Sequence, residues 1–545
     1  MDILHLLAAY PEVPLAILAF LFFVFLSHVR KAEYSIIQLP VVGVLPAALL
    51  NLHHVHDWVV TKVLEEKVFT TLIRGPWFSG MDFMMTSDPA VVQHVTSTKF
   101  NNFGKGDRFR ENCEPLGVGV ITADSDEWRA QRKVVMGLLH HPKFLSSIRG
   151  LTHQLLEGRL LPLLAHAARE EKPVDLQDIM LRFSFDIMCS LILGVDLCSL
   201  SPGLPEVPFA VAVNDVGDVI VSRFVMPQCL WKLLKWLQIG PERRLAKGMK
   251  VIDGFIYRVI ETRREQLQRE EMDDSSKTQD EKAARNAPQQ FNVLTELLRN
   301  NQLYEKTDET GDFSSAGYDA KFIRDATVDL LVAAWQTTGV AMARLLWLLC
   351  MHPSVEARIL DELGSTTTVT ARSDMAPSRQ QETAGGRMTT FHAEDLDSCV
   401  YFRGAINESL RLYAPIAFTA RCPMQGDVLP SGEELAPGML VLLSLYAMGR
   451  MQKTWGRDAA EFKPERWISK EGQLKEEISY KFAVFGAGPR MCVGKTLALA
   501  SIKAVVASVA YNFRFRVAEG HDDSVRPNVV IHMKNGLKGS LHKRW

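Results

Sequence analysis

A glycine-rich stretch near the C-terminus, residues 485–494, constrains this chain more than any other segment. Its single cysteine, Cys492, lies among glycines that permit tight turns, beside Pro489, which stiffens the backbone, and Arg490, which can hold an anion. A cysteine binds metal as the thiolate, which nearby cations and backbone N–H groups stabilise. Apolar spacing predicts a helix over 495–507, and its N-terminal dipole favours the thiolate too. The stretch therefore suits a thiolate presented to a large, flat cofactor.

Two nucleotide-binding motifs are the nearest alternatives, because the stretch ends in Gly494-Lys495-Thr496. A P-loop has four residues between its first glycine and the Gly-Lys-Thr, whereas Gly488 leaves five. A dinucleotide fingerprint needs glycine at position 491, which is Met491. Both nucleotide motifs fail on spacing. A buried structural cysteine in a turn stays open on these residues alone.

The stretch matches the haem-binding loop of the cytochrome P-450 family, Phe-x-x-Gly-x-Arg-x-Cys-x-Gly. The fixed positions are Phe485, Gly488, Arg490, Cys492 and Gly494. Four further motifs lie in family order: Trp128-Arg-Ala-Gln-Arg132, Ala333-Ala-Trp-Gln-Thr337-Thr338, Glu408-Ser-Leu-Arg411 and Phe462-Lys-Pro-Glu-Arg-Trp467. The chain thus resembles cytochrome P-450 over nearly all of its length outside 366–390. The resemblance implies a mainly α-helical fold with small β-sheets, in one large domain.

The resemblance implies that Cys492 is the axial ligand of the iron of haem b. Further cofactor contacts carried over by position are Arg490, Phe485, Gly488, Trp128, Arg132 and Arg421. Trp128 and Arg132 are four residues apart, so on a helix they share one face, and in the family these positions hydrogen-bond a haem propionate. The alternative for this pair is an amphipathic surface helix that carries a tryptophan.

A long apolar helix is predicted from about Ala320 to Met351, with Pro353 marking its end. In the family such a helix carries Ala-Gly-x-Asp/Glu-Thr, whose acid and alcohol help to deliver protons to dioxygen. This chain has Thr337 for the alcohol, but it has Ala334 for the glycine and Gln336 for the acid. An amide can orient water but cannot supply a titratable proton near neutral pH. Thr337 and Gln336 are the predicted catalytic residues.

Glu408 and Arg411 lie on one face of a predicted helix, and Arg466 lies in a later Pro-Glu-Arg-Trp turn. The resemblance implies that the three form an ion-paired triad near the cysteine loop. Breaking a buried ion pair costs ~3–5 kcal/mol, whereas an exposed pair contributes ~0–1 kcal/mol. Loss of Glu408 or Arg411 is therefore expected to abolish haem incorporation.

The stretch 446–467 resembles the plant branch of the family that hydroxylates fatty acids and alkanes at terminal or in-chain carbons. Segments 77–82, 124–133 and 174–178 resemble mid-chain alkane hydroxylases of cuticular wax synthesis within that branch. Val118 departs from the Gly-Asp-Gly turn that relatives often carry in the loop over the pocket. The predicted pocket residues, carried over by position, are Val332, Ala333, Thr338, Ile416, Ala417 and Leu537. All but Thr338 are apolar, which suits an aliphatic chain.

An uncharged apolar run from Val13 to Val29 predicts a single membrane-spanning helix. A cleaved signal peptide needs a basic residue before the run, but Asp2 and Glu12 precede it, and the basic residues follow at 30 and 31. The positive-inside rule then keeps the bulk of the chain cytosolic, anchored in the endoplasmic reticulum. The predicted domains are a membrane anchor at 1–31, a proline-rich hinge at 32–48 and a catalytic domain at 49–545, with flexible segments at about 270–290 and 366–390.

Charge and cysteine usage exclude several other classes. The 62 basic and 63 acidic residues nearly balance, so no nucleic-acid partner is indicated. Eight cysteines without Cys-x-x-Cys pairs argue against a disulfide framework or a zinc ribbon, and in favour of reduced thiols.

The resemblance implies a haem-thiolate monooxygenase that acts on a lipophilic, long-chain aliphatic molecule. Its electrons would come from NADPH through a membrane-bound NADPH-cytochrome P-450 reductase, docked on the basic face around the cysteine loop. Two alternatives stay open. A haem-thiolate isomerase or dehydratase needs no external electrons, and Gln336 favours it slightly. A non-enzymatic haem-binding sensor would not need the long pocket elements.

Overall fold

The computed structural model describes residues 39, 41–51, 54–63, 69–77, 79–275, 291–299, 320–370, 381–383, 386–526 and 528–544, and Phe20. Its α-helices are α3 (Leu45–Leu50), α4 (Val55–Trp58), α5 (Pro89–Gln93), α6 (Asp107–Asn112), α7 (Ser125–Leu139), α8 (Pro142–Leu155), α9 (Leu161–Arg169), α10 (Leu176–Met188), α11 (Pro208–Val225), α12 (Gln228–Leu237), α13 (Gly240–Ser275), α16 (Ala320–Met351), α17 (Pro353–Thr370), α18 (Val400–Leu412), α19 (Leu445–Met448), α20 (Gln452–Trp455) and α21 (Lys495–Asn512). Its strands are β1 (Thr70–Ile73), β2 (Phe83–Thr86), β3 (Phe103–Gly104), β4 (Val174–Asp175), β5 (Gln381–Thr383), β6 (Gly386–Met388), β7 (Phe418–Pro423), β8 (Asp427–Val428), β9 (Glu434–Leu435), β10 (Leu440–Ser444), β11 (Phe513–Val517), β12 (Val525–Arg526), β13 (His532–Met533) and β14 (Lys538–Lys543).

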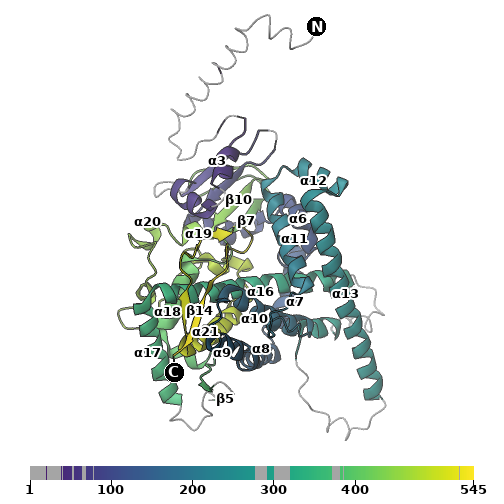
Figure 1. Ribbon diagram of the computed structural model, residues 1–545. Helices are drawn as coiled ribbons and strands as arrows, with labels where there is room; N and C mark the ends of the chain where they lie inside the picture. The colour runs from purple at the N-terminus through teal and green to yellow at the C-terminus, as the bar shows by residue number, and fades with distance from the viewer. Residues whose placement is uncertain are drawn as a thin grey trace, which may run out of the picture.

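Helix α16 runs through the middle of the helical part of the molecule (Figure 1) and packs against α10, α13, α18 and α21. Its interior has no proline, and most of its residues are buried, as expected for a central helix. Gly339 lets α10 cross closely, because a Cβ there would lie 2.9 Å from the Leu181 Cα atom. The Trp335 indole N–H also donates to the Leu181 carbonyl at 3.0 Å. The predicted helix over 320–351 is confirmed with its boundaries.

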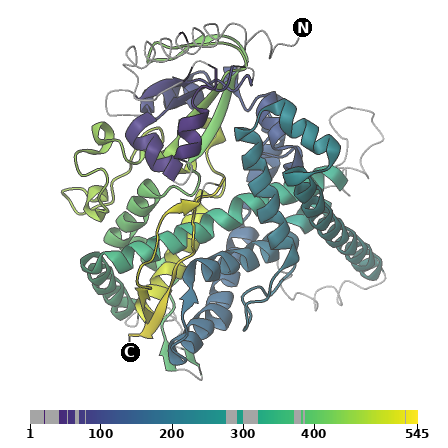
Figure 2. The same ribbon diagram turned by 45° about the horizontal axis from the view of Figure 1, so that its top comes forward.

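A five-stranded sheet in the order β1-β2-β10-β7-β3 lies at one end of the molecule with the N-terminal helices, whereas α8, α9 and α21 lie toward the other end (Figures 1 and 2). Strands β1 and β2 pair antiparallel from Thr70 opposite Thr86 to Ile73 opposite Phe83. Strand β7, which carries Arg421, pairs with β10 through Arg421 opposite Val441. This pairing fixes the backbone position of Arg421 within the sheet.

The core consists of a main cluster among the helices and a second one under the sheet. The main cluster contains Phe183 of α10, Leu331 of α16 and Val505 of α21. The second contains Met84 of β2 together with Ala487, which lies in the cysteine loop. The second cluster therefore fastens this loop to the sheet.

Parts of the predicted hinge and of the two predicted flexible segments lie within the described residues. In the second half of the hinge, the Val44 N–H donates to the Arg74 carbonyl, just after β1, at 2.9 Å. Helix α13 continues to Ser275 and helix α17 to Thr370, so the predicted flexible segments begin in regular helix. The end of the second segment is also fixed, since the Thr389 N–H donates to the Asn512 Oδ1 atom at 2.9 Å.

The predicted anchor over 13–29 lies outside the described residues, apart from Phe20. Within the described part of the chain, no helix is both long and apolar enough to cross a bilayer.

Candidate functional site

The cysteine loop is a compact turn in front of helix α21. Two short 3-10 turns, Ala483–Phe485 and Gly488–Arg490, lead to Cys492, whose N–H donates to the Phe485 carbonyl at 2.7 Å. Gly488 has φ +68°, and a Cβ there would collide with the Thr96 carbonyl oxygen. The backbone of 94–98 therefore approaches the loop so closely that only glycine fits at position 488.

Opposing effects act on the Cys492 thiol. The side chain is exposed, yet enough protein surrounds the sulfur that burial raises the pKa of the thiol above its ordinary value. The Gly494 N–H, Arg132 and Lys495 act in the opposite direction and lower that pKa. Cys492 also lies three residues before the start of α21. Coordination to a metal ion would deprotonate the thiol fully, because cysteine binds metal as the thiolate.

Cations from four separate elements surround the approach to this loop. Arg490 comes from the loop, Arg132 from α7, Arg421 from β7 and Lys105 from the turn between β3 and α6. Asp124 is the carboxylate among them: it accepts from the Arg490 Nη2 atom at 2.7 Å and from the Lys105 backbone N–H at 2.7 Å.

Burial and mutual repulsion disfavour the charged forms of these cations. Burial, followed by Arg421 and Arg490, holds the pKa of Lys105 well below its usual value. Burial, followed by Arg490, lowers the pKa of Arg421 to about 10. The single carboxylate of Asp124 does not neutralise these cations, so the site carries excess positive charge that a bound anion would balance.

The donors left over at this site fit the two carboxylates of haem. Within the described part of the chain, the Arg490 Nε and Nη1 atoms and the Arg421 Nε atom are buried and lack hydrogen-bond partners. Buried N–H groups without acceptors are costly, so an anionic group is expected to satisfy them. Arg490, Arg421, Arg132 and Lys105 would hold the carboxylates, and Cys492 would ligate the iron.

Lys105 and Asp124 belong to this site, and sequence reasoning missed their roles. The available signal was Lys105 between two glycines in Phe-Gly-Lys-Gly, and an aspartate just before the helix that carries Trp128. The indole of Trp128 lies beneath two of the cations, with the Arg490 guanidinium carbon 4.6 Å and that of Arg132 5.6 Å from its ring centroid. The face of α7 that carries Trp128 and Arg132 therefore points toward the cysteine loop.

The two predicted catalytic residues are placed differently on α16. The Thr337 hydroxyl donates back to the Ala333 carbonyl at 2.7 Å, one turn earlier. The Gln336 Nε2 atom donates to the Asn214 Oδ1 atom of α11 at 2.6 Å. Gln336 therefore joins α16 to α11 instead of lying free, and Asn214 is a partner that sequence reasoning did not find.

The six predicted pocket residues divide into two groups. Val332 and Ile416 are half-buried and Ala333 is exposed, so a ligand can contact them. Thr338, Ala417 and Leu537 are buried, at 3%, 1% and 0% exposed, respectively. Their place in the pocket stays a prediction. The Leu537 carbonyl accepts from the Leu176 N–H at 2.8 Å, and the backbone of Ile416 pairs with Val530.

Glu408, Arg411 and Arg466 lie together. The Glu408 carboxylate accepts from Arg411 Nε at 2.7 Å and from Arg466 Nε at 3.2 Å. Trp467 Nε1 and the Lys463 N–H donate to the same carboxylate, at 2.8 and 3.1 Å. Arg411 also donates to the Gly449 and Ala459 carbonyls. The group thus joins α18 to the chain that leads into the cysteine loop.

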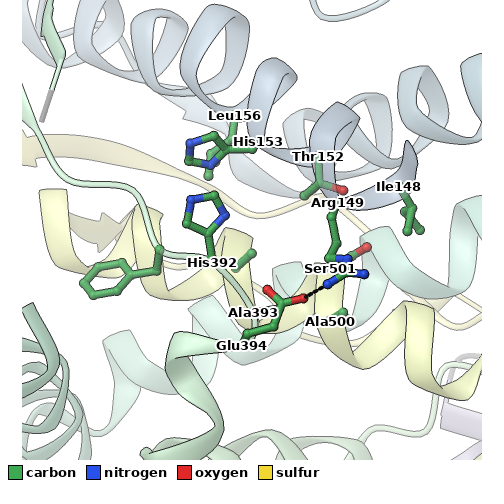
Figure 3. A pocket seen from close by; sticks show the side chains of 12 residues that line it. Ile148, Arg149, Thr152, His153, Leu156, His392, Ala393, Glu394, Ala500 and Ser501 are labelled. Atoms are coloured by element: carbon green, nitrogen blue, oxygen red, sulfur yellow. Dashed lines mark hydrogen bonds and ion pairs between the residues drawn. The ribbon is translucent and has the colours of Figure 1, made fainter. Parts of the chain in front are cut away.

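A separate cavity lies between α8, α21 and the segment 391–394 (Figure 3). It has a volume of about 30 Å³, room for one or two waters, and none of the predicted site residues lines it. His153 and His392 stack above it with ring centroids 4.2 Å apart, and Arg149 pairs with Glu394 at 2.8 Å. A cavity of this size cannot admit a long-chain substrate.

Comparison with known proteins agrees with this geometry. The family model for cytochrome P450 matches residues 40–537. Cytochrome P450 86B1 of Arabidopsis thaliana is 33% identical over 97% of this chain and 89% of its own length. Alkane hydroxylase MAH1 of the same plant is 34% identical over 95% and 96%, and noroxomaritidine synthase 2 of Narcissus aff. pseudonarcissus is 33% identical over 98% and 97%.

Among solved structures, a crystal structure of a cytochrome P450 (CYP102L1) covers 87% of this chain and 95% of its own, with a TM-score of 0.65 and 18% identity. This likeness concerns the fold alone. The family match extends over the cysteine loop, the cation group and the central helix alike. The chain therefore belongs to the cytochrome P450 family, and it is a P450 monooxygenase.

Proposed function

We propose that this P450 hydroxylates long-chain aliphatic molecules, fatty acids or alkanes, at a terminal or in-chain carbon. The observation that carries the proposal is the apolar character of the accessible side chains on the pocket side of α16, Val332 and Ala333, together with Ile416. Burial of an alkyl chain against such side chains stabilises binding by ~0.8 kcal/mol per methylene. The relatives named above include an alkane hydroxylase, which supports this substrate class, and a noroxomaritidine synthase, which makes turnover the deciding measurement.

Haem, when bound, supplies the activation of dioxygen and the insertion of one oxygen atom into a C–H bond. The residues of the chain position the cofactor and the substrate. Cys492 would ligate the iron, and Arg490, Arg421, Arg132 and Lys105 would hold the carboxylates of the cofactor. The pocket side chains exclude water and choose the carbon.

Proton delivery is the step at which this chain departs from its family. The Thr337 hydroxyl donates to Ala333 O, so its oxygen can accept from a water while its proton stays on the helix. Gln336 holds one amide hydrogen on Asn214 and keeps its carbonyl oxygen for a water. The pair can therefore orient water, but the proton itself must come from solvent.

An isomerase or dehydratase that needs no external electrons is the second candidate, favoured by the missing acid at position 336. We also propose the predicted setting: an anchor at 1–31, a hinge at 32–48 and a catalytic domain at 49–545. The chain would lie on the cytosolic side of the endoplasmic reticulum and receive NADPH-derived electrons from a cytochrome P-450 reductase.

The testing experiment is a carbon monoxide difference spectrum of the reduced full chain, followed by turnover of fatty acids and alkanes with NADPH and reductase. A thiolate-type Soret band and NADPH-dependent hydroxylated product support the proposal. Cys492→Ser is the control and is expected to lose both. A thiolate band with no aliphatic product, but with conversion in the absence of NADPH, would favour the isomerase.

A further inference from the structure

The segment 117–122, which precedes helix α7, is fastened to the N-terminal half of α16 through its backbone. The Val118 N–H donates to the Asp325 Oδ2 atom at 2.9 Å, and the Ile121 N–H donates to the Asp329 Oδ2 atom at 3.0 Å. The two aspartates are four residues apart, so they lie one turn apart on the same face of α16. Two successive turns of the helix thus hold one short segment.

This approach depends on the two glycines that flank Val118. A Cβ at Gly117 would collide with the Asp325 carboxylate, and Gly117 has φ +81°. A Cβ at Gly119 would collide with the Asp329 Oδ2 atom. Glycine at both positions is therefore what lets the carboxylates reach the backbone.

Further hydrogen bonds leave this backbone little freedom. The Gln131 Nε2 atom of α7 donates to the Val118 carbonyl at 2.7 Å. The Thr122 hydroxyl donates to the Gly117 carbonyl at 2.8 Å. Meanwhile the Val118 side chain is 39% exposed and Ile121 is partly exposed. The segment therefore has a fixed backbone and apolar side chains that a ligand can contact.

The two aspartates have different surroundings. Asp325 pairs with Lys321 and Arg324 at 2.9 and 2.8 Å. Asp329 makes no ion pair with the described residues, is 1% exposed, and its Oδ1 atom lacks a hydrogen-bond partner among them. Of the two carboxylates that hold segment 117–122, the one of Asp329 therefore has no ion-pair partner among the described residues to balance its charge.

Asp329 also stands next to the candidate site. Asp329, Ala333 and Thr337 follow one another at four-residue intervals, so they share one face of α16. The Ile121 backbone, which Asp329 holds, therefore lies about one helical turn from Ala333.

We propose that Asp329 is a positioning residue: by holding the Ile121 N–H, it fixes segment 117–122 as a wall of the substrate pocket and so determines which carbon of the substrate is hydroxylated. The second half of this inference rests on the proposed aliphatic hydroxylation. The first half, the anchoring, does not depend on the reaction.

The charge of Asp329 makes the anchor sensitive to pH. Burial raises the pKa of Asp329 to about 7, Asp325 raises it further, and the Ile121 N–H, Arg324 and Lys105 oppose the rise. The Cys113 thiol is the other titratable group that faces it. As the pH falls through this value the carboxylate is protonated, and a neutral acceptor holds the N–H less strongly. The wall is therefore firmer at pH 8 than at pH 6.

Hydrogen exchange of the haem-loaded full chain tests the anchor directly. The readout is exchange of the peptide spanning 114–124, corrected for the intrinsic pH dependence of amide exchange. Asp329→Ala is expected to speed exchange at Ile121 by about tenfold, since a charged acceptor is lost. Asp329→Asn keeps an acceptor and cannot titrate, so protection that depends on pH in the unaltered chain becomes independent of pH. Asp126→Asn, at an exposed position on α7, is the matched control and leaves exchange unchanged.

The same preparations report on position in the pocket through the substrate-induced Soret shift and the ratio of positional isomers. Asp329→Ala is expected to weaken the shift and to broaden the isomer ratio, while Asp126→Asn preserves both. Unchanged exchange at Ile121 in Asp329→Ala overturns the anchor. Faster exchange with an unchanged isomer ratio overturns the role in selectivity. If Asp329→Ala does not fold, the pH response of Asp329→Asn decides. If no aliphatic is turned over, the proposed function fails while exchange still tests the anchor.

Discussion

Arg490 and Asp124, 366 residues apart in the sequence, are joined at 2.7 Å between the cysteine loop and the start of helix α7. The same carboxylate accepts the Lys105 and Gly106 backbone N–H groups. One aspartate therefore organises the cation group on which the haem carboxylates are expected to rest.

Asp124→Ala is expected to lower the yield of haem-loaded protein severely. Removing one partner of a mostly buried ion pair costs ~3–5 kcal/mol. Here it also removes the negative charge that acts on Arg490, Lys105 and Arg421. The haem content per chain and the thiolate-type Soret band measure the loss. Asp107→Ala, which removes an exposed helical pair with Arg110, is the control. Equal haem content in both variants would contradict the role of Asp124.

Arg411→Ala is expected to abolish haem incorporation by unfolding the region before the cysteine loop. Glu408 and Arg411 are fully buried, and removal of one charge strands the other at a cost of ~3–5 kcal/mol. Arg358→Ala breaks an exposed pair with Glu465 and is expected to cost less than ~1 kcal/mol. Thermal unfolding and the carbon monoxide spectrum distinguish the two. Normal haem loading in Arg411→Ala would refute the prediction.

Gly488→Ala and Gly494→Ala should differ sharply although both lie in the same loop. At position 488 a Cβ meets the Thr96 carbonyl oxygen and φ is positive, whereas at 494 the nearest atom is the Cys492 sulfur at 3.9 Å. The first substitution should displace the loop and lose haem, and the second should retain it. Retention of haem by both variants, measured by absorbance, would mean that the loop can move away from residues 94–98.

Gln336→Glu restores a titratable acid beside Thr337 and should raise the share of NADPH electrons recovered in product. General acids typically accelerate proton transfer by ~100-fold or more, so a rise of about tenfold in coupling is a modest expectation. The ratio of product to NADPH consumed, with peroxide measured in parallel, checks it. Asn214→Ala removes the Gln336 contact without adding an acid, and should not raise the ratio. A rise in Asn214→Ala would point to release of Gln336 instead.

Acid should destabilise the protein through His56. Burial lowers the pKa of His56 to about 4, and both ring nitrogens are buried without hydrogen-bond partners among the described residues. Because the unfolded chain binds its proton near pH 6.5, it holds more protons than the folded chain between pH 4 and 6.5. The free energy of unfolding therefore falls as the pH drops through that window, by ~3 kcal/mol for one histidine.

His56→Phe should remove this part of the acid sensitivity, and His532, whose pKa burial also lowers to about 4, should keep the remainder. The ring at 56 packs beside Phe418 and Tyr446, so phenylalanine suits the site. Denaturant unfolding at pH 5 and pH 7 measures the change, with His140→Gln at an exposed position as control. The same pH slope in His56→Phe would exclude His56 as the source.

Features that lie within one contiguous stretch of this chain could be predicted from its residues alone. The family motif around Cys492 and the helix over 320–351 depend on neighbouring residues, so spacing is sufficient to predict them. Contacts between distant segments became visible only in the folded chain: Lys105 and Asp124 beside Arg490, Asn214 on Gln336, and Asp329 on Ile121.

The pocket illustrates the difference. Position in a motif placed Ala333 and Thr338 in one predicted group, yet Ala333 is exposed whereas Thr338 is 3% exposed. Which face of a helix stays open is set by what packs against it, and single-sequence periodicity does not specify that partner. The elements therefore follow from local chemistry, while the accessible surface of the site follows from how the folded chain covers them.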